Sequence, residues 1–132
     1  MSQPKAPKAA TTSAADLDAA LVVGTLSSDP VWRELPSGTT MCTLEVTTRS
    51  GEGHARSVPI VQFDPPRRLD RLAKGDRVVV AGAVVRRFFR TGGATVSRTE
   101  VTATWVKRET SASRRELVRW GTDHLANTAD PG

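Results

Sequence analysis

The segment Arg86-Arg87-Phe88-Phe89-Arg90 places two aromatic rings among three arginines. Single-stranded nucleic acids are held by this combination, because bases stack on aromatic faces while cations neutralise phosphates. Alternate side chains of a strand point to opposite faces, so Arg87 and Phe89 share one face and Arg86 and Phe88 share the other. We therefore expect one phenylalanine to enter the core and the other to lie exposed beside an arginine. The plainer alternative places both rings in the core or in a subunit interface.

The other potentially reactive residues form no catalytic arrangement. His54 and His124 are far apart in the sequence, and neither stands at a metal-ligand spacing. Cys42 lies at an apolar strand position, which favours a core residue over a nucleophile. The glycines of 51–53 and 92–93 lack the spacing and the following helix of a phosphate loop. We expect neither catalysis nor a metal or cofactor site.

Composition sets the class of protein. The chain has 132 residues, 38% of them hydrophobic, and 19 basic against 14 acidic residues give a net charge of +5. This length predicts one domain. The single cysteine excludes an internal disulfide, and no apolar run approaches the ~20 residues of a membrane helix. The first fifteen residues lack the apolar stretch of a signal peptide, so we expect a cytoplasmic protein.

Alternating and apolar runs predict the elements that would position the Arg-Phe segment. Strands are expected over 21–26, 40–48, 58–63, 76–89 and 94–106, with a short extended stretch over 31–35. Pro59 marks the third strand as an edge or irregular strand, and Gly82 predicts a bend or bulge in the fourth. Residues 76–106 then form a long hairpin that turns at Thr91-Gly92-Gly93. Pro66, tolerated in a first helical turn, begins an expected two-turn helix over 66–73.

The last strand and the C-terminal segment give two further expectations. Alternation with Val101 and Ala103 places Trp105 on the inward face of the last strand, hence in the core. Ser113 followed by Glu116 matches a capping box and predicts a short helix over 113–126, although Gly121 weakens it. We divide the chain into a flexible N-terminal arm (1–15), a folded domain (16–107) and a C-terminal extension (108–132).

The predicted order is three strands, a short helix and two strands. This order is typical of the OB-fold, an all-β five-stranded Greek-key barrel with a helix between the third and fourth strands. A β-sandwich remains the alternative.

Several motifs, in order, resemble the bacterial single-stranded DNA-binding protein family between residues 21 and 106. These are Val22-Val23-Gly24-Thr25-Leu26-Ser27-Ser28-Asp29-Pro30, then Arg33, Pro36-Ser37-Gly38, Lys74-Gly75-Asp76-Arg77-Val78, Gly82 and Thr99-Glu100-Val101. The resemblance implies an OB-fold homo-oligomer, a tetramer or dimer, that binds single-stranded DNA nonspecifically in replication, repair or recombination.

The resemblance also implies stacking roles for Phe63 and Phe89. The family's other two stacking aromatics correspond to positions near Glu52 and within 55–57, where this chain has none. The acidic C-terminal tip through which the family recruits other proteins has no equivalent at residues 128–132. The chain therefore resembles a divergent or accessory member of the family.

The resulting expectation is a nucleic-acid interface with single-stranded DNA as the partner. Its residues would be Arg49, Arg56, Phe63, Arg86, Arg87, Phe88, Phe89 and Arg90. The alternative is an OB-fold protein-interaction or structural module, of the primosomal accessory type, with weak or no DNA binding.

Overall fold

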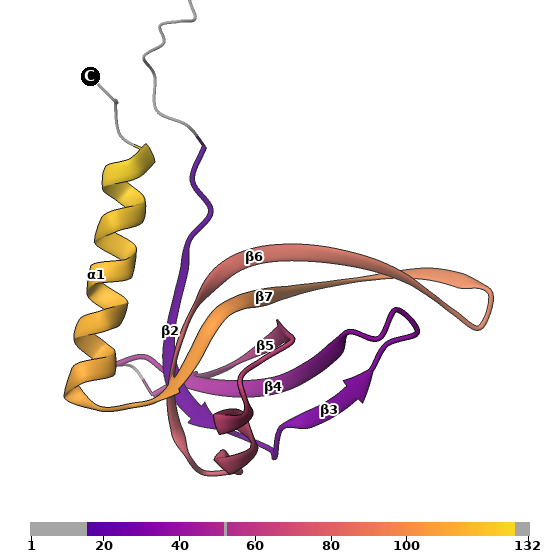
Figure 1. Cartoon of the computed structure of the whole chain (residues 1–132), viewed down its shortest axis with the longest axis horizontal. Helices are drawn as coiled ribbons and strands as arrows, with labels where there is room; N and C mark the ends of the chain where they lie inside the picture. Colours follow the sequence, from indigo (N-terminus) through magenta and orange to yellow (C-terminus); the bar gives the residue numbers. More distant parts are fainter. Residues whose placement is uncertain (1–15, 52, 129–132) are drawn as a thin grey trace, which may run out of the picture.

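Alternation of apolar and polar side chains builds most of the strands. In the second predicted strand Cys42, Leu44 and Val46 are buried, while Thr43 and Glu45 between them are partly exposed. The computed structural model describes residues 16–51 and 53–128, so the predicted arm over 1–15 lies outside the described residues. Its elements are β2 (Ala20–Leu26), β3 (Val31–Glu34), β4 (Thr40–Arg49), β5 (Ala55–Phe63), the 3₁₀ helix η1 (Arg67–Arg71), β6 (Arg77–Thr91), β7 (Ala94–Arg108) and α1 (Ser111–Thr128) (Figure 1).

The strand pairings close into a ring, with β3 added to β4 outside it. Around the ring, β2 pairs with β6, β6 with β7, β7 with β5, β5 with β4, and β4 again with β2. All these pairs are antiparallel except β5–β7, whose parallel register joins Ile60 to Val101 and Val61 to Thr102. Pro59 lies just before this parallel contact, where the register of β5 includes β4 alone. The predicted edge position is therefore confirmed at Pro59 itself, but β5 is an interior strand at Ile60 and Val61, where it pairs with both β4 and β7.

Apolar side chains from every ring strand fill the interior. The buried cluster includes Leu26, Leu44, Ile60, Val80, Val101 and Val106, with Leu69 and Leu72 closing one end. The predicted two-turn helix over 66–73 is wrong in type and length, since η1 is a 3₁₀ helix of five residues. Leu72 already has an extended backbone, and the Asp76 carboxylate accepts a hydrogen bond from the Ala73 N–H at 2.9 Å. This side-chain bond offers the backbone an alternative to a further helical turn.

A bulge at Gly82 confirms the predicted irregularity and overturns the prediction for Trp105. The β6–β7 register pairs Gly82 with Ala103 and the preceding residue with Trp105, which leaves Thr104 as the extra residue. The inward alternation therefore passes from Ala103 to Val106, and Trp105 lies outside the ring beneath α1. A Cβ at Gly82 would overlap the Thr102 carbonyl oxygen, so the close strand crossing requires glycine.

The N-terminus of α1 is capped one turn earlier than the sequence predicted. The Thr110 N–H donates to Ser113 Oγ at 2.8 Å, and the Ser113 N–H donates to Thr110 Oγ1 at 2.9 Å. This reciprocal pair replaces the predicted Ser113–Glu116 capping box, which is wrong. Glu116 instead forms an ion pair with Lys107 of β7 at 2.6 Å.

The helix docks on the outer surface of the ring, beside β2 (Figure 1). Leu117 is buried against Val79 and Ala81 of β6, and Trp105 and Trp120 pack around this second cluster. A Cβ at Gly121 would lie 3.2 Å from Leu21 Cδ1, so this glycine lets the helix approach β2 closely. Among the described residues, no helix combines the length and apolar composition needed to cross a bilayer.

Candidate nucleic-acid interface

The β6–β7 hairpin continues well beyond the ring (Figure 1). β6 pairs with β2 only as far as Gly82, and from there to the turn its register includes β7 alone. Gly92 and Gly93 form the turn with positive φ values of 56° and 83°. Val101, the partner of Val84, is the last residue of β7 toward the turn that belongs to the core cluster, so the side chains of residues 85–99 lie beyond the ring interior.

Both phenylalanines of the Arg-Phe segment are exposed. Phe88 retains 67% of its accessible surface and Phe89 retains 40%. The prediction that one ring would enter the core is wrong, because both residues lie on the hairpin beyond the ring. The pairing of faces is confirmed: the guanidinium carbon of Arg86 lies 5.9 Å from the centre of the Phe88 ring, and that of Arg87 lies 5.9 Å from the centre of the Phe89 ring.

Arg87 belongs to a charge network as well as to the aromatic pair. Its Nε lies 2.5 Å from Oε2 of Glu100, whose side chain is only 1% exposed. Arg98 lies 3.7 Å from the same carboxylate and 2.9 Å from the carboxylate of Glu45 on β4. The Ser57 hydroxyl donates to Glu45 at 2.5 Å. Glu100 thus holds both guanidinium groups in place and partly neutralises them.

A groove of about 420 Å³ joins this network to β3 and β4. Its lining consists of Val31, Arg33, Leu35, Met41, Thr43, Arg87, Phe89, Arg98 and Glu100. Met41 is also the register partner of Phe63, and paired residues of adjacent strands point to the same face. Phe63 is 39% exposed. We call the surface formed by Phe63, Phe89, Arg33, Arg87 and Arg98 the aromatic face.

The structure does not bring all the expected site residues to the aromatic face. Arg86 and Phe88 lie on the opposite face of the hairpin, and Arg90 lies next to its turn. Arg49 and Arg56 are exposed at the end of the β4–β5 pair remote from Phe63, where the Arg49 side chain donates to the Gly53 carbonyl at 3.4 Å. The second face of the hairpin and the far end of the β4–β5 pair are thus separate from the aromatic face.

Arg33 and Arg98 were missed as site residues from the sequence. Arg98 stands two positions before Glu100, so alternation alone places the two on one face. Arg33 alternates in the same way with Val31 on β3, and both line the groove. The sequence carried both signals, but nothing local indicated that β3 would lie across from the hairpin.

Cys42 is a core residue, as predicted. The side chain is fully buried, and burial raises the pKa of the thiol to about 11, with a further contribution from the negative charge of Asp70. The thiol is therefore protonated at neutral pH, and the thiolate is the nucleophilic form of cysteine.

The comparison with known families agrees with this geometry. A sequence model of the Single-strand binding protein family matches residues 17–109. The matched region spans the ring, the long hairpin and every residue of the aromatic face. No curated protein matches the chain. Because the match covers most of the sequence, the chain belongs to the single-strand binding protein family.

Proposed function

We propose that the protein binds single-stranded DNA on its aromatic face, without strong sequence preference, in DNA replication, repair or recombination. Family membership supports single-stranded DNA binding in general. The observation that carries the proposal is the exposed Phe89 ring beside Arg87, in a groove that also contains Arg33 and Arg98. Stacking on such a ring tolerates any base, because every base has a π face.

The ring of strands supports an OB-fold as the scaffold. The order of pairing, with β5 and β7 parallel and η1 between β5 and β6, fits a five-stranded Greek-key barrel. Family membership implies the same fold. We assign no catalytic step to this scaffold.

The arginines of the aromatic face differ in how far carboxylates already neutralise them, and hence in how strongly they can bind phosphates. Arg87 and Arg98 are held by Glu100 and Glu45, which fixes their positions and reduces their net charge. Arg33 forms no ion pair with any described residue. We therefore assign the strongest phosphate contact of the groove to Arg33, and an orienting role beside the stacked base to Arg87.

The remaining expected residues are proposed as outlying contacts. Arg86 and Phe88 would meet DNA that crosses the hairpin's second face, and Arg90 would meet it at the turn. Arg49 and Arg56 would neutralise phosphates at the far end of the β4–β5 pair.

A homo-oligomer, tetramer or dimer, is part of the proposal. On one side β2 pairs with β6 over Ala20–Thr25, and on the other it pairs with β4 only at Thr25 and Leu26. The remaining edge of β2 can accept a strand from a second copy.

A protein-interaction module is the second candidate. It is favoured by the absence of aromatic residues near position 52 and within 55–57, where the resemblance implied two further stacking rings. Such a module would keep the ring of strands and bind single-stranded DNA weakly or not at all.

Titration of a labelled oligo-dT, with a duplex of the same length as the control, separates the two candidates. We expect binding to the single strand in preference to the duplex. The logarithm of the affinity should fall with the logarithm of the salt concentration at a slope of about −0.7 per neutralised phosphate. No detectable binding at low salt would favour the interaction module.

A further inference from the structure

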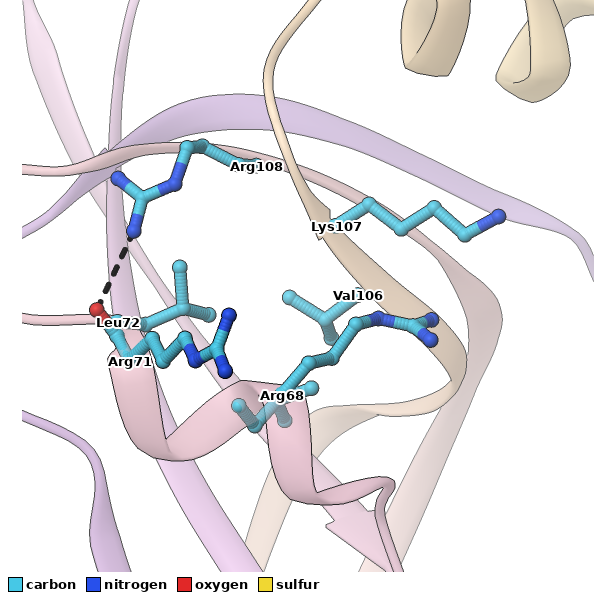
Figure 2. A pocket seen from close by; sticks show the side chains of 7 residues that line it. Arg68, Arg71, Leu72, Val106, Lys107 and Arg108 are labelled. Carbon is cyan, nitrogen blue, oxygen red and sulfur yellow. Dashed lines mark hydrogen bonds between the residues drawn. The ribbon is translucent and has the colours of Figure 1, made fainter.

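A second basic surface lies between η1 and β7 (Figure 2). It is a pocket of about 200 Å³ lined by Arg68, Leu69, Arg71, Leu72, Val106, Lys107 and Arg108. Four of these seven residues are cations and none is an acid. We call this the basic pocket; it shares no lining residue with the groove of the aromatic face.

The 3₁₀ geometry of η1 explains why its arginines gather here. Side chains three residues apart are superimposed along a 3₁₀ helix. Leu69 and Leu72, three apart, are both buried in the ring. Arg68 and Arg71, also three apart, lie together on the exposed side. Figure 2 shows both arginines beside Leu72 and Val106 at the opening of the pocket.

The four cations are not equally compensated. The Lys107 amino group lies 2.6 Å from Glu116 of α1 and points away from the pocket in Figure 2. The Arg108 guanidinium lies 3.1 Å from Asp76 and donates to the Arg71 carbonyl at 3.2 Å. Arg68 and Arg71 form no ion pair with any described residue. Two uncompensated guanidinium groups thus share one opening with a third that is already oriented.

We propose that the basic pocket binds a phosphate of single-stranded DNA as a second site, distinct from the aromatic face. The proposal rests on the proposed function and extends it. A phosphate suits the pocket because planar guanidinium groups bind its oxygens in a bidentate manner, and an anion between Arg68 and Arg71 relieves their mutual repulsion. The apolar surface of Leu72 and Val106 beside them can contact a sugar.

The bound DNA would run along β7 from one surface to the other. Arg98 of the aromatic face and Arg108 of the basic pocket are ten residues apart on that strand, which corresponds to a distance of roughly 30 Å. A short oligonucleotide can occupy the aromatic face alone, whereas a longer one reaches both surfaces. The range of ~4–16 nucleotides bound by single OB-folds includes both situations.

The test compares two oligo-dT lengths on three proteins. The lengths are about 5 and about 30 nucleotides, near the lower limit and well above the upper limit of the range that one OB-fold binds. The variant is Arg68→Ala/Arg71→Ala in the full chain. The control with the same change in net charge is Arg115→Ala/Arg119→Ala, which removes two exposed cations of α1 that do not line the basic pocket. Affinity is measured over a range of salt concentrations.

We expect the Arg68→Ala/Arg71→Ala variant to bind the long oligonucleotide about tenfold more weakly at low salt, with a salt slope shallower by about 0.7, the value for one phosphate. It should bind the short oligonucleotide as the wild type does, and the control should match the wild type with both. An unchanged affinity and slope with the long oligonucleotide would overturn the second site. An equal loss with both lengths, or an equal loss in the control, would overturn it too. Failure of the wild type to bind either oligonucleotide would instead refute the proposed function.

Discussion

The double substitution Phe63→Ala/Phe89→Ala should weaken single-stranded DNA binding by about 2–6 kcal/mol, because stacking contributes about 1–3 kcal/mol per base. This range corresponds to a roughly thirty-fold to ten-thousand-fold loss of affinity. Both rings are more than one third exposed, so their removal should leave the core intact. The loss should persist at every salt concentration, since stacking releases no counterions. A salt titration of oligo-dT affinity measures it.

Phe88→Ala is the matched comparison for this experiment. Phe88 is adjacent to Phe89 and more exposed, but it lies on the opposite face of the hairpin with Arg86. We expect a smaller loss from Phe88→Ala than from Phe89→Ala. A larger loss of affinity from Phe88→Ala than from Phe89→Ala would show that the interface lies on the other face of the hairpin. Wild-type affinity in the folded double variant would contradict the stacking role of the aromatic face.

Leu117→Ala should lower the free energy of unfolding by about 2–5 kcal/mol, the range for a buried leucine truncated to alanine. Leu117 is 6% exposed and is the buried residue through which α1 joins the outer cluster with Val79 and Ala81. Its truncation leaves a cavity between the helix and β6. Urea unfolding monitored by tryptophan fluorescence reports this loss, since Trp105 and Trp120 belong to the same cluster.

Val118→Ala provides the control on the same helix. Val118 follows Leu117 directly and is 66% exposed, so its truncation should change stability by no more than about 0.5 kcal/mol. Equal stability of the Leu117→Ala and Val118→Ala variants would show that α1 is not docked on the ring in solution.

Local patterns predicted the strands because alternation reports which side of a strand is buried. The buried positions of β4 and the bulge at Gly82 could be read directly from residue types and spacing. The position of Trp105 outside the ring could not be predicted, because the extra residue of the bulge is Thr104 and nothing in the sequence marks where on β7 the bulge occurs. One inserted residue reverses every later side chain of a strand.

The site was less predictable because it depends on contacts between distant segments. The sequence identified the two Arg-Phe pairs but not that both rings would be exposed, which follows from the end of β2–β6 pairing at Gly82. It also gave no indication that Glu100 would be buried against Arg87 and Arg98. As a consequence, charge reversal at Arg87 is a poor test of phosphate binding, since it would place a second carboxylate beside Glu100.

Photo-crosslinking of oligo-dT to the wild-type protein, with the modified residues located by mass spectrometry, tests the central claim most directly. Single-stranded DNA that stacks on the aromatic face should crosslink to Phe63 and Phe89, which come from different strands and share that face. Crosslinks confined to α1, with Phe63 and Phe89 unmodified, would contradict the account.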